Sequence, residues 1–506
     1  MTSPLVVGVD CSTTSTKAIV VDAEGAVVAQ AKAELGTSTP RADFYEQDPR
    51  DWWRSTDAAV AGALALLSPE DRERVTHLCA TVQRQSFALV DEAGRSLRPA
   101  ILWLDGRAAE QVRRLGTAEV HRLTGFQPDV TPSAYKIAWL AEHEPEVLAR
   151  ARRVVGVHAY LVHALTGRWL DSAATADSLG LFDMARLDWS DAMVAACGLR
   201  RDQLPELAPA ASELGTIRTE ISRGWGLAQE VQLVAACGDG QAAALGVGAT
   251  GPGEAYLNMG TALVAGVHSR AYRWGSVFRT DAAGLPGQYV LEIVQNSGAY
   301  LAGWFRERLG DPVLAGRPDE LLEAAAARVV AGCGGLITLP YWNAAQSPYW
   351  NPLARGAYVG LAGAHDRAAL YRSTLEGISI AMARNLAGLE SATGVPLREV
   401  TVVGGGRRSP LWRRIMADAA GLPLVESLVE EASAMGAAAM AMAATGEFAS
   451  VEDAARSLAT RGPVTEPDPA AHAVYTELGE LEAEAYECLA PVFEAQHAFA
   501  RRHPLA

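Results

Sequence analysis

The stretch VVGVDCSTTSTKAIVVD at residues 6–22 decides the fold, because it places a polar loop between two apolar runs. The apolar runs favour β-strands, which we expect at 5–9 and 18–22, with a third strand at 27–32. Six small or hydroxyl residues stand between the first two strands, with an aspartate before them and a lysine after them. Hydroxyl groups and backbone amides in such a turn can form a concavity that binds an anion. A plain polar hairpin is the alternative interpretation.

Composition bounds the possible functions. The chain has 506 residues, which predicts two domains, because one hydrophobic core rarely serves more than about 250–300 residues. A formal net charge of −15 argues against nucleic acid and an anionic membrane as partners. The six cysteines have no metal-ligand or redox spacing, so we expect reduced thiols in a cytoplasmic protein. We expect no signal peptide, membrane span or structural metal, since the sequence shows no pattern for any of them.

The order of the predicted elements indicates a duplicated core. A helix is expected over 48–67 and a strand over 77–82, and strands and helices alternate from there onward. After about residue 245 the pattern restarts, with strand, turn and strand at 253–269 and a strand running through glycines into a helix at 400–421. Such alternation predicts an α/β fold with mixed sheets, in two similar halves separated by a cleft.

Two further loops repeat the design of the first. NMGTAL (258–263) stands at the equivalent place in the second half, and GGGRRSPLWRR (404–414) is a glycine-rich turn entering a helix. Three such loops suit an extended nucleotide triphosphate, although the glycines also permit close packing of a helix on a strand. None of them matches a P-loop or the GxGxxG fingerprint, which counts against a dinucleotide oxidoreductase.

These segments resemble the FGGY family of carbohydrate kinases, and most of all its xylulokinase branch. The resemblance covers the whole chain and is carried above all by GVDCSTTSTKA (8–18), QDPRDWW (47–53), LRPAILWLDGRA (97–108), CGDGQAAALGVG (237–248), LNMGTA (257–262) and GGGRRSPLWRRIMADAAG (404–421). It implies the actin, hexokinase and heat-shock ATPase class, in which two ribonuclease H-like domains enclose ATP and substrate. We expect an N-terminal domain over 1–247, with the sugar site, first phosphate loop and catalytic base. A C-terminal domain over 248–506 would hold the second phosphate loop and the adenosine.

The resemblance implies a site for ATP and Mg²⁺. Thr13 and Thr14 would contact the β- and γ-phosphates, with Lys17 nearby as a counter-charge. Asp10 would hold Mg²⁺, usually through water, which suits an ion that keeps much of its hydration shell. The residues assigned to the nucleotide in the second half are Gly260, Thr261, Gly404, Gly405, Gly406 and Ser409.

Asp239 is the predicted catalytic base. A sugar hydroxyl is a poor nucleophile, and a positioned carboxylate can accept its proton during attack on phosphorus. Gly238 and Gly240 would leave the carboxylate open to substrate. An aspartate between two glycines is also typical of a structural turn.

The predicted sugar contacts are Arg84, Gln85, Trp103 and Asp105, together with Asp239. Arg84 and Gln85 stand where xylulokinases have Met-His and are nearer to the Arg-Glu of glycerol kinases. Arg84 would fork onto two hydroxyls or pair with an acid, and Trp103 and Asp105 would line the sugar or serve as core and helix cap. We therefore expect a sugar kinase acting on a ketose or related polyol. A non-enzymatic ATP-dependent switch is the alternative, and the helical tail near 468–502 is a candidate homodimer surface.

Overall fold

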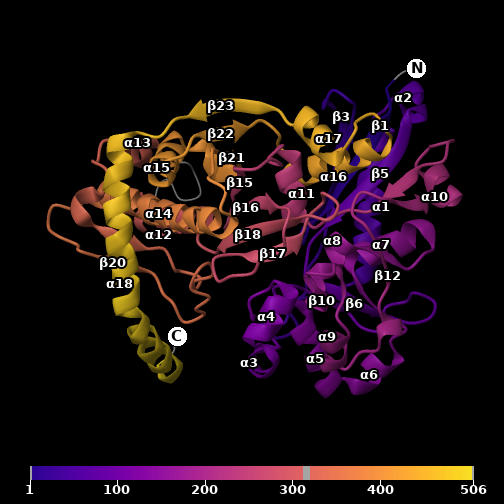
Figure 1. Ribbon diagram of the computed structural model, residues 1–506, viewed down its shortest axis with the longest axis horizontal. Helices are drawn as coiled ribbons and strands as arrows, with labels where there is room; N and C mark the ends of the chain where they lie inside the picture. The colour runs from indigo at the N-terminus through magenta and orange to yellow at the C-terminus, as the bar shows by residue number, and fades with distance from the viewer. Residues whose placement is uncertain (1–2, 312–319, 504–506) are drawn as a thin grey trace.

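The computed structural model describes residues 3–311 and 320–503, which form two lobes side by side (Figure 1). Each lobe is built around one large β-sheet, with six strands in the first lobe and seven in the second. The predicted α/β class is confirmed.

The first sheet has the strand order β13-β14-β5-β1-β2-β3. Its strands are β1 (Leu5–Cys11), β2 (Ser15–Val21), β3 (Val27–Glu34), β5 (Val75–Val82), β13 (Glu213–Thr216) and β14 (Gln232–Val234). Strands β1, β2 and β3 pair in antiparallel fashion, whereas β5 runs parallel to β1 and β14 runs parallel to β5. All seven residues of β1 are buried, which explains its continuous apolar run at the centre of the sheet.

The second sheet has the order β17-β18-β16-β15-β21-β22-β23, which repeats the first order read from its other end, with β17 added at one edge. Its strands are β15 (Glu254–Met259), β16 (Leu263–Ser269), β17 (Arg279–Ala282), β18 (Tyr289–Gln295), β21 (Glu399–Val403), β22 (Leu424–Ser427) and β23 (Arg461–Thr465). Here β15, β16 and β18 are antiparallel, while β21 is parallel to β15 and β22 to β21. The shared order is the duplicated core that the sequence predicts. It gives the β1–β2 turn and the β15–β16 turn equivalent places in their sheets.

Short strands and helices surround the two sheets. The short strands are β4 (Glu46–Gln47), β6 (Phe87–Val90), β7 (Ala100–Ile101), β8 (Arg153–Gly156), β9 (Leu170–Ser172), β10 (Phe182–Asp183), β11 (Asp188–Trp189), β12 (Glu206–Ala208), β19 (Ile337–Leu339) and β20 (Ala357–Val359). The helices of the first half are α1 (Pro49–Ala65), α2 (Pro69–Glu73), α3 (Ala109–Leu115), α4 (Ala118–Thr124), α5 (Ser133–His143), α6 (Pro145–Arg150), α7 (Val157–Thr166), α8 (Ala173–Ala176), α9 (Asp191–Ala196), α10 (Thr219–Gly224) and α11 (Asp239–Gly246). Those of the second half are α12 (Ala299–Leu309), α13 (Glu320–Ala327), α14 (Arg367–Thr393), α15 (Pro410–Ala420), α16 (Ala432–Ala444), α17 (Val451–Leu458) and α18 (Pro469–Arg502).

Helix α16 crosses from the second half of the sequence to the first lobe. It packs on β1, β2 and β5 and lies against α11. The approach is very close, because a Cβ atom at Gly8 would lie 2.1 Å from the Ala434 carbonyl oxygen, and one at Gly246 would lie 1.9 Å from that of Ala432. Small residues on both sides of the contact are therefore required. Residue 247 falls between β14 of the first sheet and β15 of the second, but α16, which follows residue 247 in the sequence, packs on the first sheet. The domain division at residue 247 stays a prediction.

The predicted elements differ from the structure mainly at their ends. Strand β2 begins at Ser15, earlier than predicted, because Thr16 still pairs with Cys11 across the hairpin. Helix α1 begins after Asp48, whose side chain accepts a hydrogen bond from the Arg50 amide. The predicted helical tail forms one long helix, α18. In the part of the chain that is described, no helix has the length and apolar character needed to span a bilayer.

Candidate active site

The β1–β2 turn at residues 12–14 presents two threonines at the edge of the first sheet. Thr14 is exposed and Thr13 is half-buried. The Thr13 hydroxyl donates to Gln83 Oε1 at 3.3 Å and accepts from Trp103 Nε1 at 3.0 Å. These contacts tie the predicted phosphate turn to the predicted sugar loop.

Asp10 lies beside this turn and is 8% exposed. Its Oδ2 accepts a hydrogen bond of 2.7 Å from Ser12, while its buried Oδ1 has no hydrogen-bond partner among the described residues. Burial and the nearby Asp239 raise the pKa of Asp10 to about 7, although the Ser12 hydrogen bond and Lys17 act in the opposite direction. A cation beside Oδ1 would supply both a partner and a compensating charge. The residues present therefore fit a Mg²⁺ ion.

Lys17 forms an ion pair with Glu431, next to the start of α16. The Lys17 Nζ atom lies 2.6 Å from Glu431 Oε2, and each side chain is about one third exposed, at 33% and 32%. The predicted counter-charge for phosphate is thus already paired. A phosphate group would have to compete with Glu431 for it, and this role of Lys17 stays a prediction.

Asp239 is the first residue of α11 and its side chain is 37% exposed. Its Oδ1 accepts hydrogen bonds from the Gly240 amide at 2.9 Å and from Arg84 Nε at 3.2 Å. Within the described chain, Oδ2 has no hydrogen-bond partner. One carboxylate oxygen is therefore fixed and the other is free to accept a proton.

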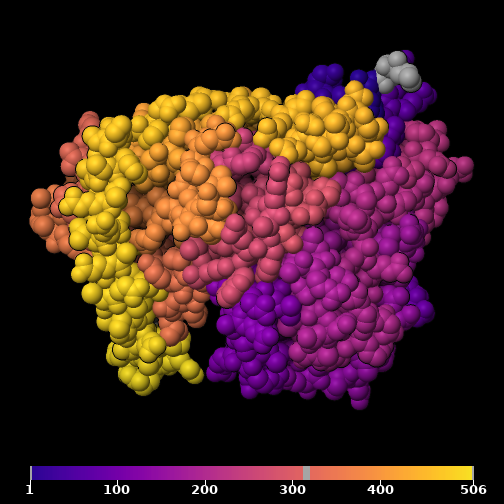
Figure 2. Space-filling view, in the orientation of Figure 1, coloured from indigo at the N-terminus to yellow at the C-terminus, as the bar shows by residue number. Residues whose placement is uncertain are grey.

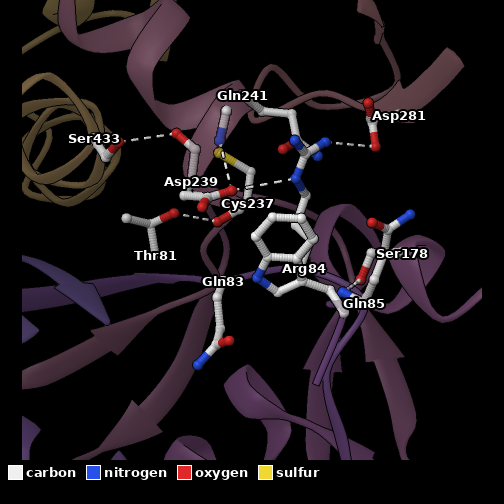
Figure 3. A network of polar contacts seen from close by, with 12 residues as sticks. Thr81, Gln83, Arg84, Gln85, Ser178, Cys237, Asp239, Gln241, Asp281 and Ser433 are labelled. Carbon is white, nitrogen blue, oxygen red and sulfur yellow. Dashed lines mark hydrogen bonds and ion pairs between the residues drawn. The ribbon is translucent and has the colours of Figure 1, made fainter. Parts of the chain in front are cut away.

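The backbone around Asp239 is held from two sides (Figure 3). Thr81 of β5 donates to the Cys237 carbonyl at 2.6 Å, and Ser433 of α16 donates to the Asp239 carbonyl at 3.0 Å. Gly238 has a further reason to be glycine, because a Cβ atom there would lie 2.4 Å from Arg84 Cδ. Rigid support of this kind is what a precisely positioned catalytic group needs.

Arg84 joins the two halves of the chain at this point. Its Nε lies 3.2 Å from Asp239, its Nη1 2.9 Å from Asp281 and its Nη2 2.9 Å from Glu292. Arg84 follows β5 in the first lobe and is 10% exposed, whereas Asp281 on β17 and Glu292 on β18 are fully buried in the second lobe. The predicted fork of Arg84 onto sugar hydroxyls is thus corrected, because three carboxylates hold its guanidinium.

The carboxylates behind Arg84 form a buried acidic cluster. Burial raises the pKa of Glu292, but Arg279 and Arg84 outweigh that effect and lower it to about 2. Asp177 has a pKa well above its usual value because of burial and the neighbouring Asp281. Asp177 also accepts a 2.7 Å hydrogen bond from the backbone of β17 and is fully buried. It connects the two lobes and does not face a substrate.

The remaining predicted sugar contacts differ in whether their polar groups already have partners in the protein. Gln85 has a positive φ of 60°, its amide donates to the Ser178 hydroxyl at 3.3 Å, and its buried Nε2 has no partner in the described structure. Its role stays a prediction, as does that of the half-buried Trp103. Asp105 is 0% exposed and forms an ion pair of 2.7 Å with Arg107. This internal pairing corrects the prediction that Asp105 contacts a sugar hydroxyl.

The β15–β16 turn presents Gly260 and the exposed Thr261 from the second lobe. Its carbonyl groups are hydrogen-bonded to the start of α12. The Gly260 oxygen accepts a hydrogen bond from the Ala299 amide at 2.8 Å, and the Thr261 oxygen accepts one from the Gly298 amide at 3.1 Å. The turn is therefore rigidly attached to the helix that lines the neighbouring cavity.

That cavity has a volume of about 910 Å³ and lies between α12, α13 and α15. Gly405, Gly406 and Ser409, three of the predicted nucleotide residues, line it. The Ser409 hydroxyl caps α15 at the Trp412 amide and donates to Glu323 at 3.1 Å. The cavity is thus large enough for a nucleoside, and the β15–β16 turn lies close enough to it to contact the attached phosphates.

Sequence reasoning missed Asp281, Glu292 and Glu323. A signal for Glu292 was present, since it stands alone as a charged residue in the apolar strand Tyr289–Gln295. A charged residue in a buried strand requires a partner. Among the described residues, no three His, Cys, Asp or Glu side chains gather as a metal cage, and Asp10 is a single carboxylate.

Comparison with known proteins agrees with this geometry. The chain matches the models for the FGGY family of carbohydrate kinases, with the N-terminal domain at residues 5–246 and the C-terminal domain at 255–445. A xylulose kinase of Escherichia coli (strain K12) is 32% identical over 496 residues, covering 96% of this chain and 99% of the relative. A glycerol kinase of Bordetella parapertussis is 31% identical over 473 residues, covering 88% of this chain and 90% of the relative.

The solved structures agree as well. A xylulose kinase from Rhodospirillum rubrum superimposes with a TM-score of 0.90 at 29% identity, covering 97% of this chain and 100% of that one. The predicted ribonuclease H-like class, shared with actin, hexokinase and heat-shock ATPases, is thereby confirmed. From these matches and from the two sheets with their equivalent turns, we conclude that the chain belongs to the FGGY family of carbohydrate kinases.

Proposed function

We propose that this kinase transfers the γ-phosphate of ATP to a hydroxyl group of a ketose such as xylulose or of a related polyol. One observation carries the proposal. Asp239 offers a carboxylate with one fixed and one free oxygen, close enough to the β1–β2 turn for its charge to raise the pKa of Asp10. A switch without a substrate has no use for such a base.

Asp239 acts as the general base. It accepts the proton of the sugar hydroxyl at its free Oδ2 while the hydroxyl oxygen attacks phosphorus in line. Arg84 keeps Oδ1 in place, so the carboxylate needs little reorganisation when the sugar arrives.

Asp10 is the proposed Mg²⁺ site. When bound, Mg²⁺ neutralises charge on the transferring phosphoryl group. Thr13 and Thr14 would orient the terminal phosphates from the first lobe, and Gly260 and Thr261 from the second. The adenosine would occupy the cavity of about 910 Å³ beside Gly405.

Gly405 gives a test of the nucleotide site. A Cβ atom at Gly405 would have no neighbour within 4 Å, whereas one at Gly404, where φ is +84°, would lie 2.4 Å from Asn258 Oδ1. Gly405→Ala is therefore expected to fold normally and raise the KM for ATP several-fold, because its methyl group enters the cavity. Gly404→Ala should instead lower the melting temperature. Steady-state kinetics and thermal unfolding measure both, and an unchanged KM in Gly405→Ala would argue against nucleotide binding here.

The sugar is identified by an assay of ADP release over ketopentoses, ketotetroses, ketohexoses and polyols. We expect turnover of a substrate other than, or in addition to, D-xylulose, because Gln85 brings an unpartnered amide nitrogen to the position after Arg84. The matched relatives include both xylulose and glycerol kinases, which supports a panel of this breadth. Strict selectivity for D-xylulose would contradict the expectation, and no ADP release with any sugar would contradict the proposed function.

A further inference from the structure

Lys136 of helix α5 is a basic side chain that water does not reach, since its exposed fraction is 0%. Helix α5 belongs to the lower part of the first lobe (Figure 1), and in the space-filling view an open gap separates this part from the second lobe (Figure 2). A buried ammonium group is costly unless every N–H group has an acceptor. The groups that accept these hydrogen bonds are therefore tightly coupled to Lys136.

The ammonium group of Lys136 donates to three backbone carbonyl oxygens. Its Nζ atom lies 2.6 Å from the oxygen of Thr131, 3.2 Å from that of Val130 and 3.4 Å from that of Trp103. An ammonium group has three N–H groups and no acceptor, so three carbonyl oxygens match it. The neutral amine has two N–H groups, which would leave one carbonyl oxygen without a donor. The contact with Trp103 is the longest of the three and is the first that deprotonation would remove.

The composition of the chain indicates that this position needs a lysine. Only three of the 44 basic residues are lysines, and the side chains of the other two, Lys17 and Lys32, are 33% and 51% exposed. A guanidinium group is planar, with five donors in a fixed fork, whereas an ammonium group is compact. Three carbonyl oxygens around one buried point therefore suit lysine and not arginine.

The three carbonyl groups belong to two separate loops. Trp103 lies in the loop between β7 and α3, and the other two carbonyl groups lie in the loop before α5. Trp103 is fixed at two further points, since its amide donates to the Ser86 hydroxyl at 3.1 Å and its Nε1 to the Thr13 hydroxyl at 3.0 Å. Lys136 supplies the third contact, which ties Trp103 to α5.

We propose that Lys136 is a positioning residue for the sugar, because its ammonium group holds the backbone of Trp103 and thereby fixes the indole as one wall of the sugar site. The inference rests on the proposed function, in which Trp103 lines the sugar. Loss of the ammonium group should weaken sugar binding. It should affect ATP much less, because the Thr13 hydroxyl keeps its contact with Gln83.

Burial makes this contact sensitive to pH. It lowers the pKa of Lys136 to about 7, while Asp105 and Asp129 act in the opposite direction and Arg107 adds to the effect. Asp129, whose own pKa is raised by burial, is also influenced by Arg279 of β17. The ammonium group is therefore present below about pH 7 and lost above it. Because the lysine of the unfolded chain keeps its proton up to a higher pH, this loss does not lower the stability of the fold.

The first experiment measures steady-state kinetics of the wild type between pH 6 and 9, with the sugar that the assay of ADP release identifies. We expect the KM for the sugar to begin to rise near pH 7 and to increase several-fold by pH 9, while the KM for ATP does not rise. Asp10 has a similar pKa, but its carboxylate is gained as the pH rises, so its effect on Mg²⁺ has the opposite direction. A KM for the sugar that stays constant over this range would overturn the proposal.

Lys136→Met removes the ammonium group at every pH. Its KM for the sugar should be raised about fivefold or more already at pH 6 and should no longer depend on pH, since small displacements of a positioning group are costly. Lys32→Met is the matched control, because Lys32 is half exposed on β3, and it should behave as the wild type does. In a Trp103→Ala background, Lys136→Met should add nothing further, because both changes act through one contact. Additive effects, or a pH dependence that survives in Lys136→Met, would contradict the proposal.

The second experiment uses no sugar, so its failure is distinct from a failure of the proposed function, which the absence of ADP release would show. Hydrogen exchange of the amides at 102–107 and 127–132 should be faster in Lys136→Met than in the wild type and in Lys32→Met. If Lys136→Met does not fold, the wild type provides the same test, because exchange in these two loops, corrected for the intrinsic effect of pH, should quicken between pH 6 and 9. Equal protection of the loops in these comparisons would also overturn the proposal.

Discussion

Asp239→Asn is expected to lower kcat by at least about a hundredfold, since general-base catalysis is typically worth about 10²–10⁴-fold. The amide keeps the size of the carboxylate and can still accept the Gly240 hydrogen bond, but it cannot take a proton from the sugar. Binding of the sugar should weaken much less, and binding of ATP should hardly change. Turnover, both affinities and the melting temperature are measured on one preparation.

Asp188→Asn is the matched control for this substitution. The Asp188 side chain is 42% exposed and paired with Arg201, so it resembles Asp239 in exposure and pairing but belongs to the β10–β11 hairpin. It should retain full turnover. Near-normal turnover in a well-folded Asp239→Asn would exclude Asp239 as the base. A large fall in its melting temperature would instead favour the structural-turn interpretation.

Arg84→Met is expected to lower the free energy of unfolding by about 3–5 kcal/mol, because it leaves buried carboxylates without their cation. Asp281 and Glu292 are fully buried, and among the described residues Arg279 is the one cation that would remain paired with them. Turnover should fall as well, since Asp239 loses the group that fixes its Oδ1. Chemical denaturation measures the first effect and steady-state kinetics the second.

Arg50→Met provides the comparison for Arg84. Arg50 also pairs with an aspartate, Asp48, but its side chain is 67% exposed, and exposed ion pairs contribute little to stability. Its denaturation midpoint should be almost unchanged. If Arg84→Met were equally stable, the cluster would not depend on this cation, and Arg84 would be free to serve the sugar as first predicted.

The sequence predicted the duplicated α/β core well, because it is encoded locally. Apolar runs with hydroxyl or glycine turns between them identify β1, β2, β15 and β16 with little ambiguity. The ends of the strands were less certain, since Ser15 and Thr16 are polar residues that the hairpin nevertheless pairs. Burial between neighbouring strands overrides their local preference.

The site was harder to predict, because its geometry depends on pairs that are far apart in the sequence. Nothing in the sequence next to Arg84 indicated its partners, because Asp281 and Glu292 lie on strands from the other half of the chain. Asp105 was predicted to contact the sugar because its neighbours in the sequence do not determine whether the Arg107 side chain turns toward it. Positions along the chain predict residue type and local structure, whereas the pairing of buried charges is a property of the tertiary fold.

The placement of α16 has a consequence for the order in which this protein is made. The ribosome completes β1, β2 and β5 early, yet the helix that covers them comes from residues 432–444. At translation rates of about 5–20 residues per second, the nascent first sheet waits on the order of 10–40 s after α11 for that cover. During this interval its apolar face is exposed to chaperones and to neighbouring nascent chains. Messages truncated between residues 247 and 432 should therefore yield chains that are retained by chaperones or degraded, even though every strand of the first sheet is present.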